Sequence, residues 1–225
     1  MLKTEHCPFR SKVRSATRAF AAAMLFISGS AVSASISPAK AADSRSCVIE
    51  ASNGENEVQE DGVWQTAAAG DVLNVNARLR TGPNGRIYIV CSDKVTVTLG
   101  ADTEIGFEKL VAVTQTESAV ARLARGIAGF IVPLLGEARF EVRTPEAVAS
   151  VRSTEWTVDA SDAGTSVFVR EGSVSVTAAA GGAEPVLLSE GDGVDVTAAT
   201  GTGPVRQWSA NRIEAMNGRL GFDWQ

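Results

Sequence analysis

The residues best suited to chemistry are three closely spaced carboxylates, Glu190, Asp192 and Asp195. A pair of carboxylates flanking a sugar bond is the catalytic apparatus of most glycosidases. The glycines between them, in Glu190-Gly-Asp192-Gly-Val-Asp195, are also typical of a solvated turn, and this is the interpretation that we favour. A weak Ca²⁺ site is the third interpretation. We therefore expect no catalytic residue, no cofactor and no metal here.

The rest of the sequence has none of the short signatures of common enzyme classes. It contains no G-x-S-x-G, no C-x-x-C, no Walker loop and no G-x-G-x-x-G. The single histidine, His6, lies in a segment that export would remove, so the mature chain would lack imidazole as a general base or metal ligand. The sequence predicts a protein that is not an enzyme.

Residues 1–42 have the three parts of a secretory signal peptide. An apolar, small-residue run spans residues 19–36, and Ala39-Lys-Ala41 is a small-residue cleavage site. An uncleaved anchor is the alternative, but serines dilute a run already shorter than the roughly 20 apolar residues of a spanning helix. We expect cleavage after Ala41 or Ala42 and a periplasmic or secreted protein. The basic residues before the apolar run are Lys3, Arg10, Lys12, Arg14 and Arg18.

Cleavage would make the chain strongly acidic. The full sequence has 21 basic and 26 acidic residues, and residues 1–42 hold six of the basic ones and one acidic one. The mature chain would therefore carry 15 basic and 25 acidic residues, a net charge of −10. Such a protein repels nucleic acid and anionic lipid, so we expect no nucleic-acid partner and no stable membrane insertion after cleavage.

Two cysteines, Cys47 and Cys91, would remain once the leader and Cys7 are removed. In an oxidising compartment an even pair predicts one disulfide, worth on the order of 3 to 4 kcal/mol. Two buried thiols are the alternative. Two distant thiolates without histidine do not suit a metal site.

Short apolar runs of period two recur along the mature chain, rich in valine and threonine and separated by Gly, Asp, Asn and Thr. They predict an all-β domain over residues 43–204, built as a sandwich, a roll or a short solenoid of stacked hairpins. Val167, Val169, Val174 and Val176 alternate with polar residues on either side of Glu171-Gly172, which predicts a hairpin with one buried face.

A helical segment is expected over residues 205–225. Trp208, Ile213, Met216 and Leu220 fall on one face of a helix, which predicts a short C-terminal helix. This segment would either cap an open sheet edge, which we favour, or serve as a docking peptide, since Trp and Phe are strong interface anchors.

Three segments in the second half of the chain carry a family resemblance. They are Phe140-Glu-Val142-Arg-Thr144-Pro145, Val151-Arg152-Ser153-Thr154-Glu-Trp156-Thr-Val158 and Val167-Phe-Val169-Arg-Glu-Gly172-Ser-Val174-Ser-Val176. They resemble the FecR domain, whose members tend to have V-x-T-P, V-R-G-T-x-F-x-V and V-x-V-x-x-G-x-V-x-V. Ser153 stands where the family prefers glycine and Trp156 where it prefers phenylalanine. The motif residues are Thr144, Pro145, Val151, Arg152, Thr154, Trp156 and Gly172.

The resemblance implies a role in signalling. FecR-like proteins are periplasmic sensors that relay a signal from an outer-membrane transporter to a cytoplasmic sigma factor through a transmembrane helix. We expect this chain to be a soluble form lacking the transmembrane and anti-sigma segments. It would be a non-enzymatic binding or signalling protein of a Gram-negative cell envelope, with a protein partner such as an outer-membrane protein. The alternatives are a structural or secreted envelope component and a carboxylate-dependent glycan-active enzyme.

Arg152 has two interpretations. It could be the partner in a structural ion pair, which we favour, or an exposed recognition residue.

Overall fold

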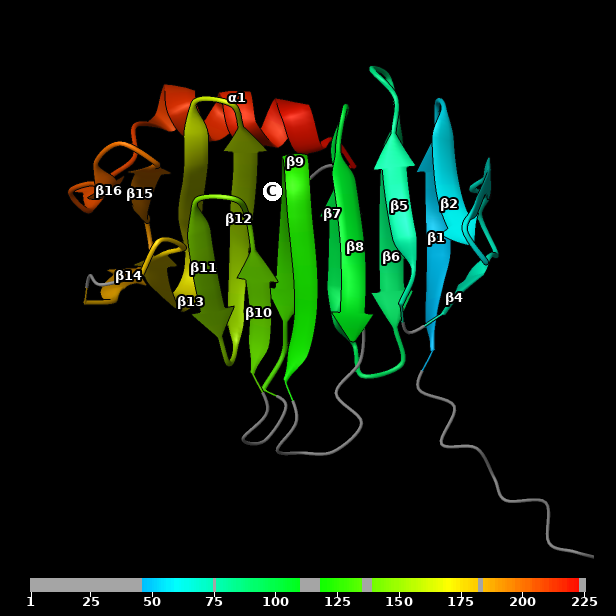
Figure 1. The fold of residues 1–225 in the computed structure, drawn as a ribbon, viewed down its shortest axis with the longest axis horizontal. Coiled ribbons are helices and arrows are strands. Elements are labelled where there is room, and N and C mark those ends of the chain that lie inside the picture. Colours follow the sequence, from blue (N-terminus) through cyan, green and yellow to red (C-terminus); the bar gives the residue numbers. More distant parts are fainter. Residues whose placement is uncertain (1–45, 75, 110–117, 135–138, 182–183, 223–225) are drawn as a thin grey trace, which may run out of the picture. The chain divides into compact units, whose positions relative to one another are not determined.

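The computed structural model describes residues 46–74, 76–109, 118–134, 139–181 and 184–222. They form strands and one C-terminal helix, α1 (Ala210–Leu220), which confirms the predicted all-β class (Figure 1). The strands are β1 (Cys47–Asn53), β2 (Asn56–Glu60), β3 (Val63–Thr66), β4 (Val72–Leu73), β5 (Arg78–Thr81), β6 (Arg86–Cys91), β7 (Thr96–Leu99), β8 (Glu104–Lys109), β9 (Ala119–Val132), β10 (Phe140–Arg143), β11 (Ala147–Val151), β12 (Thr154–Ser161), β13 (Gly164–Ala178), β14 (Val186–Ser189), β15 (Asp192–Thr197), β16 (Gly201–Thr202) and β17 (Arg206–Gln207).

Strand pairing separates two sheets, which share two strands. Sheet A has the order β4-β1-β6-β7-β9-β12-β13-β15, with β16 and β17 against β15. Sheet B has the order β3-β2-β5-β8-β9-β10-β11-β13-β14. These pairings are antiparallel except that of β9 with β10, which is parallel.

Strands β9 and β13 belong to both sheets because each bends at a glycine. The first half of β9 pairs with β8 and β10 in sheet B, and from Gly126 onward it pairs with β7 and β12 in sheet A. Strand β13 pairs with β12 up to Gly172, then with β11 and β14 in sheet B. Both glycines have a φ of +88°, a conformation that suits glycine best.

The hairpin predicted around Glu171-Gly172 is therefore wrong. The chain continues through Gly172 as one strand of 15 residues, and the ladder with β12 shifts register between Glu155 and Trp156. A bulge of this kind bends a strand without reversing it, because partner strands are present on both sides of the bend.

Gly172→Ala is expected to lower the free energy of unfolding by about 2 to 3 kcal/mol, since it combines an unfavourable φ with a clash. A Cβ atom at this position would lie 2.6 Å from the carbonyl oxygen of Ser153. The matched control is Gly62→Ala, which has a φ of +82° but no heavy atom within 4 Å of the added carbon and should cost only about 1 kcal/mol. Urea denaturation compares the two, and equal losses would contradict the proposed packing at the bend.

The core lies between the two sheets and is built around three aromatic rings. Trp156 of β12, Phe130 of β9 and Phe140 of β10 are fully buried. The ring centroid of Phe130 lies 5.2 Å from that of Trp156 and 5.2 Å from that of Phe140. Because these strands belong to different sheets, the aromatic cluster joins the two layers.

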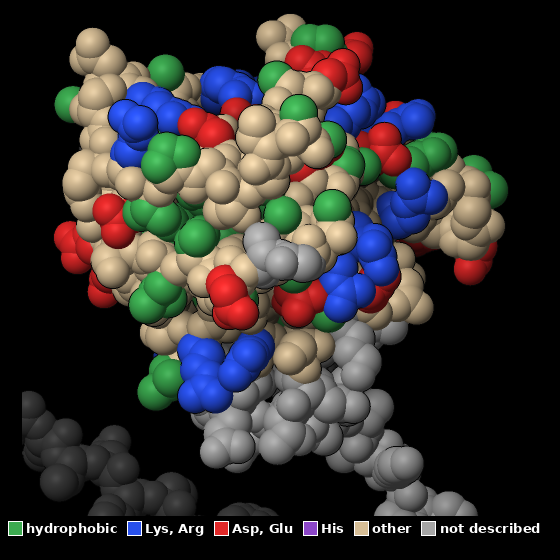
Figure 2. Space-filling view, turned by 60° about the vertical axis from the view of Figure 1, so that its left-hand side comes forward, with side chains coloured by type: hydrophobic (Ala, Val, Ile, Leu, Met, Phe, Trp, Pro, Cys, Tyr) green, Lys and Arg blue, Asp and Glu red, His purple; other side chains and the backbone are tan. Residues whose placement is uncertain are grey.

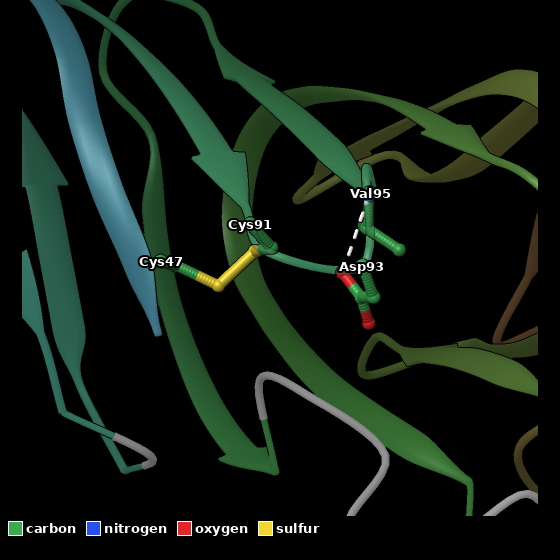
Figure 3. Close-up of a disulfide and its surroundings, with 4 residues drawn as sticks. All are labelled: Cys47, Cys91, Asp93 and Val95. Atoms are coloured by element: carbon green, nitrogen blue, oxygen red, sulfur yellow. Dashed lines mark hydrogen bonds between the residues drawn. A yellow bond between two sulfur atoms is a disulfide. The ribbon is translucent and has the colours of Figure 1, made fainter. Parts of the chain in front are cut away.

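The structure has a disulfide between Cys47, which begins β1, and Cys91, which ends β6 (Figure 3). The two residues are register partners in neighbouring strands, and both are buried. In the turn that follows, Asp93 Oδ1 accepts a hydrogen bond from the backbone N–H of Val95 at 3.2 Å. The disulfide therefore links the neighbouring strands β1 and β6 within sheet A.

The oxidation state in the exported protein stays a prediction. A protein that has lost residues 1–42 should show no free thiol when it is titrated under denaturing, non-reducing conditions. Two titratable thiols per chain would mean that Cys47 and Cys91 are not bridged.

Helix α1 covers the outer face of sheet A, not its edge (Figure 1). Met216 and Leu220 are buried against Ile127 and Phe168, in a cluster separate from the main core. The sheet edge is extended instead by the two-residue strand β17, which precedes the helix and pairs with β15. The predicted edge cap is therefore wrong for the helix itself, because its apolar side chains meet a row of outward-facing apolar residues. No helix in the described part of the chain is long and apolar enough to cross a membrane.

Two glycines make room for the C-terminal segment. A Cβ atom at Gly193 would lie 2.1 Å from Trp208 Nε1, and one at Gly100 would lie 2.6 Å from the carbonyl oxygen of Arg219. Trp208 stacks on Phe168 with ring centroids 5.0 Å apart. Residues 208–220 are thus packed as part of the fold.

Candidate functional site

Most of the FecR-like motif residues have structural roles. Thr144 and Pro145 form the turn between β10 and β11, where the Thr144 hydroxyl accepts a hydrogen bond from the N–H of Ala147 at 2.9 Å. The buried Thr154 donates its hydroxyl to the carbonyl of Ser173 at 2.9 Å, next to the bend in β13. Val151 and Trp156 are buried in the core. These residues shape the fold.

Arg152 differs from them because it points to solvent at the turn between β11 and β12. Among the described residues it has no ion-pair partner, so the structural ion pair favoured from the sequence is not formed. Its neighbour Ser153 does not have a positive φ, so serine replaces the family's glycine there without backbone strain. Arg152 is exposed, as the alternative interpretation expects.

Arg152 lines a groove on the outer face of sheet B with a volume of about 420 Å³. A second arginine, Arg139, and the exposed Leu187 of β14 line the same groove. The remaining described residues that line it are Ser150, Val151, Ser153, Ser173 and Ser175, none of which is acidic. We call this site the Arg152 groove.

Strand register explains why serines line the groove. Ser150 of β11 pairs with Ser175 of β13, which in turn pairs with Leu187 of β14. Side chains of paired residues lie on the same face of a sheet, so this row crosses three neighbouring strands. Serine is small, and the row therefore leaves a hollow between the longer side chains of Arg152 and Leu187.

Other arginines of sheet B are neutralised by acidic neighbours. Basic and acidic side chains are interspersed over the molecular face in Figure 2. Within the described residues of sheet B, the ion pairs join Arg78 to Glu104, Arg80 to Glu57, Arg122 to Glu108, Arg125 to Glu104 and Arg143 to Glu141. The uncompensated positive charge at the Arg152 groove is therefore a local exception.

Two of the three carboxylates that the sequence singled out, Asp192 and Asp195, bond to neighbouring groups of the fold, and the side chain of Glu190 makes no hydrogen bond or ion pair with the described part of the chain. Asp192 Oδ2 accepts a hydrogen bond from the N–H of Ser189 at 2.9 Å, and its Oδ1 accepts from Gln207 Nε2 at 2.7 Å. Asp195 binds the guanidinium of Arg212 and the hydroxyl of Ser166. This arrangement favours the turn interpretation over a glycosidase pair. In the described ranges, no three side chains of His, Cys, Asp or Glu are grouped to hold a metal ion.

The hydrogen bonds from Arg212, aided by Ser166 and opposed by partial burial, hold the pKa of Asp195 below its usual range. A carboxyl group whose pKa is lower in the folded state stabilises the fold above its unfolded pKa of about 3.9, and this stabilisation is lost as the pH falls through the folded pKa.

Asp195→Asn should therefore lower the free energy of unfolding at pH 7 by about 0.5 kcal/mol, because the pair is largely solvent-exposed, and by less at pH 3. Denaturant titrations of both proteins at the two pH values check this. A difference that is the same at pH 7 and pH 3 would contradict the assigned role of the carboxylate charge.

Comparison with known proteins supports the motif assignment. Residues 77–175 match the family model described as FecR protein, which confirms the resemblance found in the sequence. Among solved structures, the fold is similar to that of a candidate anti-sigma factor from Parabacteroides distasonis ATCC 8503, in crystal structures at 2.50 Å and 1.65 Å resolution. Each superposes with a TM-score of 0.53 and is 20% identical in sequence to this chain. The matched region covers 61% of this chain in both comparisons, and 62% and 63% of the respective solved chains. This chain thus spans about three fifths of their length. No curated protein matches it.

Proposed function

Because residues 77–175 form a FecR domain, we propose that this chain is a signalling-type FecR-like protein that acts by binding a protein partner, without catalytic turnover. The observation that carries the proposal is Arg152, the one charged residue of the FecR motif, which is exposed in a groove and has no ion-pair partner among the described residues. An exposed, uncompensated arginine is a common anchor of protein interfaces. The fold likeness to a candidate anti-sigma factor agrees with a role in signalling.

We infer that the protein is exported, on the strength of residues 1–42, and the FecR resemblance makes the periplasm of a Gram-negative cell, or the outside of that cell, the expected location. Their basic segment, apolar run and Ala39-Lys-Ala41 are what signal peptidase requires. Intact-mass analysis of the exported protein should give a chain that begins at Ala42 or Asp43. A membrane-bound species that retains Met1 would contradict this placement.

Site-specific photo-crosslinking in living cells tests partner binding. A photoreactive phenylalanine derivative replaces Leu187 beside the Arg152 groove in one variant and Val63 on β3 in the other. The two positions are matched, with exposed fractions of 67% and 62%. We expect a discrete crosslinked species from position 187 and none from position 63. The same result at both positions, or no crosslink at either, would argue against a partner at this groove.

A further inference from the structure

The chemistry of the Arg152 groove identifies the kind of partner segment that fits it. We propose that the groove binds an extended acidic segment of the partner protein, with a carboxylate at Arg139 and Arg152 and an apolar side chain against Leu187. This inference rests on the proposed function, since it names the ligand of the same site.

The charge of the groove selects an anion. Two arginines line the groove, and none of its described lining residues is acidic, although Glu141 is the register partner of Ser150 and pairs with Arg143. Neither arginine has an ion-pair partner among the described residues, whereas five others in sheet B do. The planar guanidinium group holds a carboxylate through two parallel hydrogen bonds, so a carboxylate satisfies donors that the fold leaves open.

The serine hydroxyls add further donors for the same anion. Ser150, Ser153, Ser173 and Ser175 line the groove, and the side-chain hydroxyls of these described residues make no hydrogen bond within the chain. A hydroxyl can donate to a carboxylate oxygen and accept from a peptide N–H. The groove therefore offers partners to both the acidic side chain and the backbone of a bound segment.

The sheet edge beside the groove favours an extended segment. Strand β14 is the last strand of sheet B, and over the described residues no second strand pairs with it. An extended peptide can add to such an edge, with side chains of alternate residues reaching the same face. Leu187 is 67% exposed on this face, which provides an apolar contact that a free phosphate or a lipid headgroup would not use.

The experiment titrates the purified protein with three probes and follows backbone amide chemical shifts by NMR. The first is a blocked five-residue peptide that alternates valine with glutamate, the second is its glutamine counterpart, and the third is inorganic phosphate. We expect saturable shift changes at Ser150, Ser173 and Ser175 with the glutamate peptide, and binding at least about tenfold weaker for the other two.

Variants assign the effect to the groove. Arg152→Gln should weaken the glutamate peptide by about tenfold, the loss of one charge-assisted pair. Arg206→Gln is the matched control, since Arg206 of β17 is also exposed but lies in sheet A. The affinity of this variant for the glutamate peptide should equal that of the original protein. Thermal melts of both variants verify that each is folded.

Three results would overturn the inference. They are equal binding of the glutamine peptide, tighter binding of phosphate, and unchanged glutamate-peptide binding by Arg152→Gln. If the crosslink from position 187 persists in the Arg152→Gln variant, a partner binds but the acidic-ligand inference is wrong. If neither crosslinking position captures a partner, the proposed function itself fails.

Discussion

Removal of residues 205–225 is expected to lower the free energy of unfolding by at least about 4 kcal/mol and to cause self-association. Each fully buried apolar side chain contributes roughly 1.5 to 3 kcal/mol, and the deletion removes Met216 and Leu220 together with the ring of Trp208. It also exposes Ile127 and Phe168 on the outer face of sheet A, where a contiguous apolar patch promotes association. Denaturant titration and size-exclusion chromatography measure the two effects.

A milder variant keeps this prediction testable if the truncated chain does not fold. Leu220→Ala should lower the free energy of unfolding by about 2 to 5 kcal/mol, because Leu220, the last residue of α1, is completely buried against sheet A. The control is Glu214→Gln on the exposed side of α1, which should change stability by less than about 0.5 kcal/mol. A truncated protein that melts unchanged and stays monomeric, yet loses its partner, would show that the segment is a docking tail.

Trp156→Ala is expected to lower the free energy of unfolding by about 3 to 5 kcal/mol, since it leaves a cavity between the two sheets. Trp156 is completely buried and packs on Phe130, which in turn packs on Phe140. Urea denaturation at pH 7 measures the loss.

Trp156→Phe, which restores the residue that the FecR family prefers, should cost less than about 1.5 kcal/mol. The indole Nε1 is buried without a hydrogen-bond partner, so phenylalanine removes an unsatisfied donor while it loses part of the packing. Similar losses for the alanine and phenylalanine variants would contradict this view of the core.

Local sequence signals predicted the all-β class correctly. Thr144-Pro145 also ends β10 for a local reason, because proline fixes its own φ and makes its predecessor extended, which requires no knowledge of distant residues. Gly172 was misjudged because alternating valines on both sides of a glycine fit either a hairpin or a bent strand. The choice depends on which strands lie alongside, and β11 and β14 come from other parts of the chain.

The sequence identified Arg152 as a motif residue, but it could not decide whether Arg152 is paired or exposed. Whether an arginine is paired depends on acidic side chains that the fold brings near it, and none of the described residues that line this groove is acidic. The groove itself requires Ser150 and Ser175 to become register partners across two strands. One available signal was the serines at outward positions in the motif strands, since small polar residues in a row leave space on a sheet.

The measurement that tests the central claim most directly is crosslinking from position 187 in cells that carry Arg152→Gln. The account predicts that the partner captured by the otherwise unchanged protein is lost in Arg152→Gln and retained in Arg206→Gln, with equal amounts of folded protein in each. Capture of the same partner in equal yield from both variants would contradict the claim that Arg152 anchors the partner in this groove.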